Sequence, residues 1–461
     1  MDNLQNIKNV YFLGIGGIGM SALARYFKNL GKNVAGYDRT HTKLTEALQL
    51  EGIEVYYDDD IRNIPSRWDP AETLAVFTPA LPYEHKQLTW FREKTIGLLK
   101  RAKVLGMICN EKDCIAVAGT HGKTTVSTMT AVILKDTKQG CGAFLGGISK
   151  NIGSNLLLPP YGSSWIVAEA DEFDRLFLHI EPYLALVTSL DADHLDIYGN
   201  KAKIEESFEK FISQIKPGGK LVVKKGVDLD ISKTKAEVFT YSLKDQADFT
   251  TLNLKLREED GFYSFDLKTP DGIISNCVLQ YPGLVNVENS VAAAALAFLS
   301  GTPADDIKAG IEKYQGVVRR FDVKFRGGNK IYIDDYAHHP AELEAFITSV
   351  KALYPTRKIT GIFQPHLYSR TRDFLDGFAA SLDLLDEAIL LPLYPAREEP
   401  IPGVSSELIY NKMNCQRKFL AGKKEVPGLL KELAAEVVLT MGAGDIDGIG
   451  ESIVDVLKEM N

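Results

Sequence analysis

The chain has 461 residues and a net charge of −8, with 45% hydrophobic and 25% charged residues, an ordinary composition for a soluble globular protein. The acidic balance argues against a general nucleic-acid binder, and no apolar run approaches the roughly 20 residues that a membrane-spanning helix needs. The five cysteines are scattered and the amino-terminal segment lacks signal-peptide features, so we expect a cytoplasmic protein. At roughly 150 residues per domain, the length predicts about three domains.

The first predicted domain covers residues 1–107. It contains NVYFLGIGGIGMSALARYFKNLG, which has the pattern of a strand, a glycine turn and an amphipathic helix. Two further apolar segments, NVAGYD and LAVFTPALP, follow as strands. Strands that alternate with helices favour a parallel sheet covered by helices.

The glycine turn of this domain, residues 14–19, matches the GxGxxG pattern, and a carboxylate ends the next strand. Alone, this pattern is typical of dinucleotide-binding oxidoreductases. Because a backbone turn at a helix N-terminus binds any pyrophosphate, a UDP-sugar fits equally well. A tightly packed turn without a ligand is the remaining alternative. The residues predicted for this site are Gly14, Gly16, Gly17, Gly19, Asp38 and Thr78.

The second predicted domain, residues 108–318, begins with another strand, glycine-rich loop and helix. The loop GTHGKTT, here called the phosphate loop, is shorter than the usual P-loop pattern, because Val117 stands where the first glycine belongs. Lys123 is expected to reach the β- and γ-phosphates of ATP, and the Thr124 hydroxyl to bind Mg²⁺. A glycine turn with a solvated lysine is the alternative. The predicted nucleotide-binding residues of this loop are Gly119, Thr120, His121, Gly122, Lys123, Thr124 and Thr125.

Acidic and histidine residues follow the next two predicted strands of this domain. Glu169, Asp171 and Glu172 in AEADEFD end one predicted strand, and Asp193, His194 and Asp196 in DADHLD end the next. A magnesium ion that bridges ATP phosphates needs hard oxygen ligands. The sequence therefore predicts a Mg²⁺ site at these strand ends, with Mn²⁺ as the alternative metal.

The third predicted domain covers residues 319–461. The second domain is expected to end with short alternating strands and a helix. The third domain then contains four apolar segments: IYIDDYA, KITGIFQPH, EAILLPLYPA and EVVLTMGAGD. Each is predicted to be a strand that ends in polar or glycine residues. Ligands in open α/β sheets collect at the carboxyl ends of strands, so we expect functional residues there.

Over essentially its full length the chain resembles the Mur ligase family. The resemblance rests on FLGIGGIGMSALA, GTHGKTT, EADE, DADHLD, GLVNVENSVAA, RRF, DDYAHHP, FQPHLYSRTRDF and GAGD, in that order. It implies an α/β fold of three domains: a Rossmann-like UDP-binding domain, a central P-loop ATPase domain with a mostly parallel sheet, and a Rossmann-like C-terminal domain that receives the amino acid. The implied activity is an ATP-dependent ligase of peptidoglycan synthesis that joins L-alanine to the lactyl carboxylate of UDP-N-acetylmuramate through an acyl phosphate.

The resemblance also assigns roles to individual residues. Lys123 and Thr124 serve the ATP phosphates and the metal, Glu169 and His194 match metal-site residues, and His194 and His338 are candidates for the base that deprotonates alanine. The other matches are Asn286 and Asn289 on the nucleotide side, Arg320 and Asp335 closing over ATP, and Tyr336, His338, His366 and Arg370 at the alanine site.

Two segments depart from the family pattern. AEADEFDRLF replaces the EADESDASF form, which affects the substrate contacts expected around Phe173 and Arg175. Leu367 stands where many members carry arginine, which moves the expected alanine recognition onto Arg370 and Arg372.

The implied partners are the small molecules ATP, UDP-N-acetylmuramate and L-alanine, and the protein is expected to be a monomer or a weak homodimer. Three alternatives stay open at this point. They are a ligase that adds a tripeptide to the same sugar nucleotide, a nicotinamide-dependent oxidoreductase, and a non-enzymatic P-loop switch.

Overall fold

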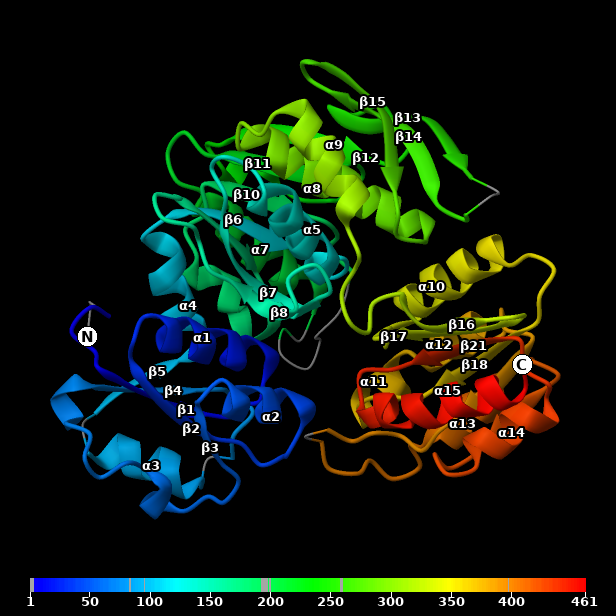
Figure 1. Cartoon of the computed structure of the whole chain (residues 1–461), viewed down its shortest axis with the longest axis horizontal. Coiled ribbons are helices and arrows are strands. Elements are labelled where there is room, and N and C mark those ends of the chain that lie inside the picture. The colour runs from blue at the N-terminus through cyan, green and yellow to red at the C-terminus, as the bar shows by residue number, and fades with distance from the viewer. Residues whose placement is uncertain are drawn as a thin grey trace. The chain divides into compact units, whose positions relative to one another are not determined.

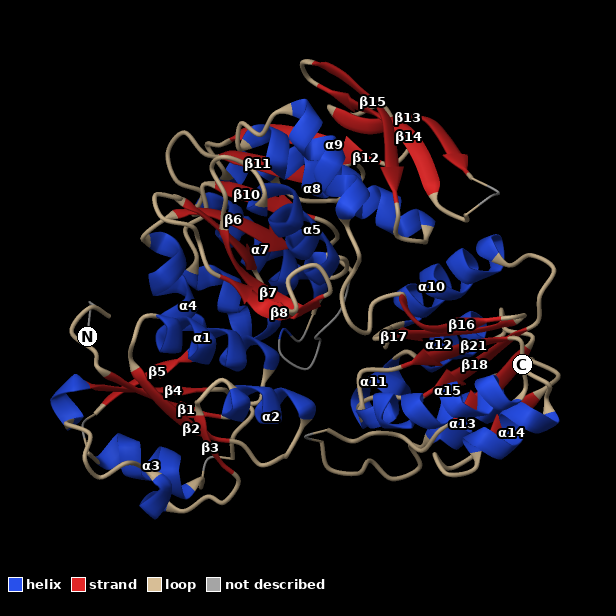
Figure 2. Cartoon of the chain, in the orientation of Figure 1, coloured by secondary structure: helices blue, strands red, loops and turns tan. Residues whose placement is uncertain are grey.

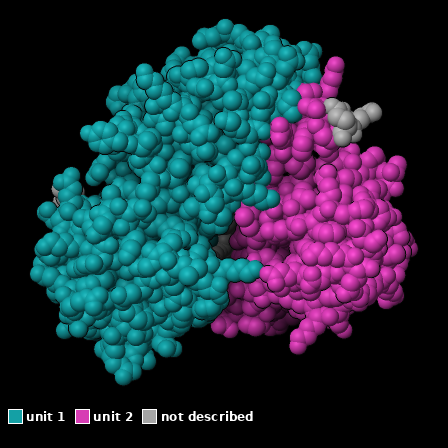
Figure 3. Space-filling view, in the orientation of Figure 1, with its two compact units in different colours: residues 1–254, 265–278, 289–315 teal, residues 255–264, 279–288, 316–461 magenta. Residues whose placement is uncertain are grey.

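A computed structural model describes residues 4–82, 84–94, 96–191, 198, 200–257, 260–396 and 398–461. The described residues form three sheets, and the chain divides into two compact units (Figures 1 and 3). Unit 1 contains residues 1–254, 265–278 and 289–315, and unit 2 contains residues 255–264, 279–288 and 316–461. Within the described residues, no helix combines the length and the apolar character that crossing a membrane requires.

The first sheet is parallel and has the strand order β3-β2-β1-β4-β5 (Figure 2). Both of its faces are covered. Val10 and Phe12 of β1 pack into a core with helices α1 and α4, and the alternate residues Tyr11 and Leu13 pack with α3. The elements are β1 (Asn9–Leu13), α1 (Ile18–Asn29), β2 (Asn33–Tyr37), α2 (Lys43–Leu50), β3 (Glu54–Tyr56), η1 (Ile61–Asn63), η2 (Pro70–Glu72), β4 (Thr73–Phe77), α3 (Lys86–Glu93), β5 (Gly97–Lys100) and α4 (Arg101–Asn110).

The second sheet has the order β15-β14-β13-β12-β11-β10-β6-β9-β7-β8. Its strands from β13 through β7 pair in parallel, and β8 is antiparallel to β7. The first elements are β6 (Asp113–Ala118), α5 (Lys123–Lys135), β7 (Gly142–Ser149), β8 (Ser154–Leu157), β9 (Trp165–Glu169), η3 (Phe173–His179), β10 (Leu184–Val187), α7 (Lys201–Ser213) and β11 (Lys220–Lys224). They are followed by η4 (Ile231–Lys233), β12 (Glu237–Ser242), β13 (Phe249–Leu256), β14 (Tyr263–Thr269), β15 (Gly272–Leu279), α8 (Leu284–Leu299) and α9 (Ala304–Lys313).

The third sheet has the order β16-β17-β21-β18-β19-β20, in which only the edge pair β16–β17 is antiparallel. One core on this sheet joins Ile362, Ile389 and Val438 to residues of α14 and α15. The elements are β16 (Asp322–Gly327), β17 (Lys330–Asp335), α10 (Pro340–Leu353), β18 (Ile359–Phe363), α11 (Tyr368–Asp373), α12 (Leu375–Leu382), β19 (Glu387–Leu390), α13 (Ser406–Lys412), β20 (Lys418–Leu420), α14 (Val426–Glu432), β21 (Val437–Met441), η5 (Asp445–Ile449) and α15 (Gly450–Glu459).

The sheets explain why residues far apart in the sequence meet. Strands β1, β2 and β4 are parallel neighbours, and so are β10, β6 and β9, and also β17, β21 and β18. The predicted functional segments follow the carboxyl ends of these strands. Because parallel neighbours end at the same edge of a sheet, the segments of each sheet lie together at that edge. The predicted α/β fold with mostly parallel sheets is confirmed.

Candidate active site

The phosphate loop, residues 119–125, joins β6 to α5. Gly119 has φ +126° and Gly122 has φ +81°, both in the left-handed region that side chains rarely adopt. A Cβ at Gly119 would clash with the Thr188 hydroxyl, and one at Gly122 would lie 2.9 Å from Oδ1 of Asn289. Both positions therefore require glycine, and Asn289 lies beside the loop, as the resemblance implies.

The segment that follows β10 fixes the shape of this loop. The Ser189 hydroxyl accepts a hydrogen bond of 3.0 Å from the His121 N–H and lies 2.8 Å from the Thr120 hydroxyl. The Asp191 N–H donates to Thr120 Oγ1 at 3.1 Å, and Nε2 of His121 lies 3.2 Å from an Asp191 carboxylate oxygen. These contacts fix the conformation of the first residues of the loop.

Lys123 is the first residue of α5, and its side chain turns back into the loop. Its Nζ atom donates to the Gly119 carbonyl at 2.7 Å and lies 2.8 Å from Oε2 of Glu172. Both side chains of this ion pair are almost completely buried. Burial lowers the pKa of Lys123, but nearby carboxylates, Glu172 first, outweigh it and raise that pKa above its ordinary value. Burial is also the main cause of the raised pKa of Glu172.

Two acidic residues that follow β9 have different surroundings. Glu169 ends β9, and its carboxylate lies so close to Gly146 of β7 that a Cβ at Gly146 would clash with it. Glu172, three residues later, is the partner of Lys123. Sequence reasoning placed Glu172 only among the acids at this strand end. Its pairing with Lys123 bridges 49 residues, and no local pattern predicts it.

The predicted metal site is incompletely described, because His194 and Asp193 lie outside the described residues. Among the residues that are described, no group of three or more histidine, cysteine, aspartate or glutamate side chains could hold a metal ion. The remaining predicted donors are the buried Thr124 hydroxyl at the start of α5 and the Glu169 carboxylate. These are hard oxygen ligands, which fit Mg²⁺ in kind.

The glycine turn, residues 14–19, lies at the carboxyl ends of β1, β2 and β4. The Asp38 carboxylate accepts hydrogen bonds from the Gly16 N–H at 2.8 Å and the Thr40 N–H at 3.0 Å. A Cβ at Gly14, which has φ +88°, would lie 2.6 Å from Cγ2 of Thr78. The structure therefore brings together the residues that the sequence predicted for this site. Gly17 is the N-cap of α1, and its N–H donates to the Gly14 carbonyl at 3.2 Å.

Two residues at the glycine turn were missed by the sequence analysis. Thr45 of α2 lies against Gly16, since a Cβ there would come within 2.7 Å of its methyl group. Arg101, the first residue of α4, places its guanidinium against Gly19, where a Cβ would clash with it. A cation beside the first turn of α1 suits an anionic ligand.

In unit 2, Asp335 ends β17 and fixes the preceding segment. Its carboxylate accepts hydrogen bonds from the Phe321 N–H at 2.7 Å and the Ala337 N–H at 2.8 Å. Burial raises the pKa of Asp335 to about 6, although Arg320 and these two N–H groups lower it. The guanidinium of Arg320 lies 5.1 Å from the ring centre of Tyr336. Three predicted site residues are therefore neighbours.

The adjacent Arg319 has a structural role. Its guanidinium donates to the Gly442 carbonyl at 2.6 Å and the Gly444 carbonyl at 3.2 Å, and its Nε lies 3.3 Å from the buried Asp334 carboxylate. It ties the loop after β21 to the start of the third sheet. Arg320 is thus the member of the pair that remains a candidate for contact with a nucleotide.

The predicted alanine-site residues lie together in unit 2. The His338 ring is 5.4 Å from the Tyr336 ring and 6.1 Å from the His366 ring. Nδ1 of His338 lies 3.2 Å from Oε2 of Glu342. The His366 ring stacks on Tyr394 with centres 5.8 Å apart. The neighbouring His339 instead accepts a hydrogen bond at the start of α10 and packs against Phe374.

The two departures from the family pattern also have structural counterparts. Leu367 is the N-cap of α11, is buried and has φ +70°, so no arginine head group lies there. Arg370 of α11 is buried, whereas Arg372 is half-exposed and pairs with Asp373. Arg175 has φ +55° and lies over the Tyr198 ring.

The last two predicted nucleotide-side residues both belong to α8. Asn286 donates from Nδ2 to the Pro282 carbonyl at 2.6 Å, and Asn289 lies beside Gly122 as described above. Both side chains are buried.

Comparison with known families identifies the class of protein. The Mur ligase family catalytic domain matches residues 9–113, the Mur ligase middle domain matches residues 117–297, and the Mur ligase glutamate ligase domain matches residues 319–444. The chain belongs to the Mur ligase family.

Individual relatives extend over the whole chain. A UDP-N-acetylmuramate–L-alanine ligase of Phocaeicola vulgatus is 48% identical, with 99% of this chain and 100% of the relative covered. One of Parabacteroides distasonis is 49% identical, with 99% and 98% covered. The crystal structure of UDP-N-acetylmuramate-alanine ligase from Thermotoga maritima has a TM-score of 0.82 at 25% identity and covers 98% of this chain and 100% of that chain.

Proposed function

We propose that the chain is an ATP-dependent ligase that joins L-alanine to the lactyl carboxylate of UDP-N-acetylmuramate in peptidoglycan precursor synthesis. The observation that carries the proposal is the buried Lys123–Glu172 pair at the phosphate loop. Full-length relatives at 48% and 49% identity that bear this activity in their names support the choice of substrates.

The proposed division of labour follows the three sheets. Residues 1–107 bind the UDP part of the substrate, residues 108–318 bind ATP, and residues 319–461 bind alanine. For UDP we propose the glycine turn with Asp38 and Thr78, whose backbone and carboxylate surroundings suit a pyrophosphate and a ribose. For ATP we propose the phosphate loop, Asn286, Asn289, Arg320 and Asp335. For alanine we propose Tyr336, His338, His366 and Arg370.

A magnesium ion would be held by the Thr124 hydroxyl and the Glu169 carboxylate, together with His194, with manganese as the alternative. Such an ion neutralises negative charge on the ATP phosphates. Lys123 supplies a further positive charge inside the loop, where its ammonium group is already oriented by the Gly119 carbonyl. Phosphoryl transfer depends mainly on positioning and charge stabilisation, which this group of residues provides.

The reaction proceeds in two steps. An oxygen of the lactyl carboxylate attacks the γ-phosphorus of ATP, the bond to the β-phosphate oxygen breaks, and an acyl phosphate and ADP form. The neutral amine of alanine then attacks the acyl carbon, an amide forms, and phosphate leaves. The amine loses a proton in this step. His338 is the proposed acceptor because its ring is 5.4 Å from the Tyr336 ring and 6.1 Å from the His366 ring, and its Nδ1 lies 3.2 Å from Glu342.

The reaction is proposed to take place in the cytoplasm by a monomer or weak homodimer. The five cysteines are all buried free thiols, a form that a reducing compartment maintains. The proposed cell-wall role requires UDP-N-acetylmuramate, ATP and alanine, and neither nucleic acid nor membrane insertion.

An acceptor-specificity assay tests the proposal. Purified protein receives ATP, Mg²⁺, UDP-N-acetylmuramate and either L-alanine or the tripeptide L-alanyl-γ-D-glutamyl-diaminopimelate, and ADP and the new amide are quantified. We expect stoichiometric ADP and amide with alanine and little with the tripeptide. Preference for the tripeptide would change the substrate assignment, and no ADP with either acceptor would refute the ligase. Saturable NADH binding at micromolar concentration would favour an oxidoreductase instead.

A further inference from the structure

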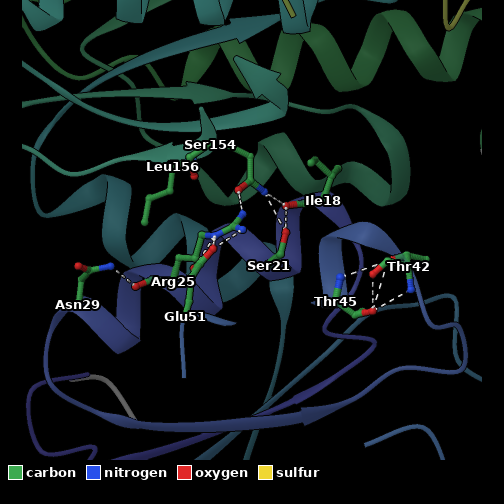
Figure 4. Close-up of polar contacts among 10 residues, drawn as sticks. Ile18, Ser21, Arg25, Asn29, Thr42, Thr45, Glu51, Ser154 and Leu156 are labelled. Atoms are coloured by element: carbon green, nitrogen blue, oxygen red, sulfur yellow. Dashed lines mark hydrogen bonds and ion pairs between the residues drawn. The ribbon is translucent and has the colours of Figure 1, made fainter. Parts of the chain in front are cut away.

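A buried asparagine of the second sheet is bonded to the helix that follows the glycine turn. Asn155 of β8 is completely buried. Its Nδ2 donates to the Ile18 carbonyl at 2.5 Å and to the Ser21 hydroxyl at 2.9 Å, and its Oδ1 accepts from Nη1 of Arg25 at 2.5 Å. Figure 4 shows Ile18, Ser21 and Arg25 on one side of α1, facing the strand that carries Ser154 and Leu156. We call this set of contacts the junction.

Arg25 connects a second helix to the same place. Its Nε and Nη2 atoms donate to both oxygens of Glu51, at distances from 2.7 to 3.0 Å. Glu51 is the C-cap of α2. The Arg25 side chain is 9% exposed and the Glu51 side chain 41% exposed. Glu51 neutralises the charge of Arg25, and Nη1 of Arg25 bonds Asn155 on the buried side of the guanidinium.

The two helices that meet at the junction are also those that border the glycine turn. The N-cap of α1 is Gly17, and the Ile18 carbonyl bonded by Asn155 belongs to the first turn of this helix. Thr45 in the first turn of α2 lies against Gly16. A shift of the junction would therefore move both helix N-termini that border the proposed pyrophosphate site.

Strand β8, which carries Asn155, also connects the junction to Glu169, the proposed metal ligand. β8 pairs with β7, and β7 pairs with β9, which ends at Glu169. Gly146 of β7 is packed directly against the Glu169 carboxylate. Tyr26 of α1 and Phe144 of β7 add an aromatic contact with ring centres 5.4 Å apart. A continuous series of packed groups thus links the glycine turn to Glu169, at the end of the strand that pairs with β6, which leads into the phosphate loop.

We propose that Asn155 is a positioning residue that fixes the glycine turn relative to the phosphate loop, so that the lactyl carboxylate of the bound sugar nucleotide reaches the γ-phosphate of ATP. This inference rests on the proposed function. Asn155 acts through α1, since it is buried behind the first turn of the helix. A displacement of about 1 Å between reacting groups can cost about 100-fold in rate, so a buried contact of this kind affects turnover more than ground-state binding.

The test compares Asn155→Ala with Asn9→Ala. Asn9 is also a buried asparagine, and its side chain bonds Thr73 and Asn33 at the opposite end of β1 from the glycine turn, outside the junction. Both variants lose buried hydrogen bonds, so a general loss of stability affects both. Only Asn155→Ala removes one of the donors to the Ile18 carbonyl, which also accepts from the Ser21 hydroxyl, together with the acceptor of an Arg25 N–H. Ser21→Ala, which removes one partner of Asn155, serves as a milder junction variant.

Turnover and Michaelis constants are measured well below the thermal midpoint of each folded variant. We expect kcat of Asn155→Ala to fall by about tenfold or more, with the KM for ATP within about twofold of wild type. Ser21→Ala should show a smaller decrease in kcat, and Asn9→Ala a lower thermal midpoint with wild-type kcat. Equal kcat values for Asn155→Ala and Asn9→Ala would overturn the proposal.

Hydrogen–deuterium exchange tests the same inference without any reaction. We expect faster exchange in Asn155→Ala both in the first turn of α1 and in β7, and neither change in Asn9→Ala. If the wild-type protein ligates nothing, the proposed function fails. The exchange measurement would still test whether Asn155 couples α1 to β7. If the exchange rate in Asn155→Ala increases only in β8, the junction does not couple the two sites.

Discussion

Nζ of Lys123 and Oε2 of Glu172 lie 2.8 Å apart, and both side chains are nearly inaccessible to solvent. A buried ion pair of this kind is costly to break, because removal of one partner leaves an uncompensated charge. Glu172 therefore neutralises the ammonium group that is proposed to contact the ATP phosphates.

The first prediction concerns Lys123→Ala. We expect ligation to be abolished, because the only described cation inside the phosphate loop is lost, while binding of the UDP substrate persists in the first domain. Calorimetric titration with UDP-N-acetylmuramate and an ADP-release assay measure the two effects. Lys135→Ala, at the opposite end of α5 and paired with Asp136 at the surface, is the matched control and should retain activity. Turnover at the wild-type rate in Lys123→Ala would remove the ATP assignment.

Gly119→Ala should damage the phosphate loop directly. Its backbone has φ +126° and a Cβ would clash with Thr188, so we expect turnover to fall by about 100-fold or more. Gly428→Ala is the control, because a Cβ there meets no atom within 4 Å and the residue lies within α14. That variant should be neutral or stabilised by up to about 1 kcal/mol. Steady-state ADP release and thermal melting distinguish these outcomes, and near-normal activity of Gly119→Ala would contradict the loop geometry.

Asp335 predicts a pH dependence of stability. Its folded-state pKa is about 6 against an ordinary 3.8, so the folded protein binds this proton more tightly than the unfolded chain. Between these two values the folded state carries more protons, and stability attributable to Asp335 is lost as the pH rises. Relative to Asp335→Asn, wild type should therefore have its highest thermal midpoint near pH 4 and lose this advantage by about pH 6 to 7. A constant difference between the two melting curves across this range would show that the carboxyl does not titrate there.

His338→Gln tests the alanine site. We expect the KM for L-alanine to rise and kcat to fall, together by about 100-fold in kcat/KM, because general-base catalysis by a side chain typically contributes that much. The KM for ATP should change little. His179→Gln, in η3, is the control and should behave as wild type. An unchanged kcat/KM for alanine in His338→Gln would assign the base to another residue.

The sequence predicted the fold class and the local motifs well, and the reason is physical. The order strand, glycine-rich loop and helix is a local pattern, so the phosphate loop at Gly119 and the glycine turn at Gly14 are confirmed as the connections that were predicted. Ligands in open α/β sheets collect at the carboxyl ends of strands, and this rule predicted that Asp38, Glu169 and Asp335 lie next to these loops or at strand ends.

Contacts between distant segments could not be predicted in the same way. Glu172 was not recognised as the partner of Lys123, and neither Arg101 beside Gly19 nor Asn155 beside Ile18 was named. Each depends on side-chain packing across 49 to 137 residues of chain, which leaves no periodic signal in the sequence. His194 lies outside the described residues, and the roles given to the site residues are proposals.

The hydrophobic core that contains Val10 and Phe27 of the first sheet and its helix also contains Phe144 and Ile166 of the second sheet. A fragment cut between these sheets would expose the apolar face of α1 to water. We therefore expect residues 1–107 expressed alone to aggregate, and a truncation that retains both sheets to be the smallest useful starting point for isolating the nucleotide sites.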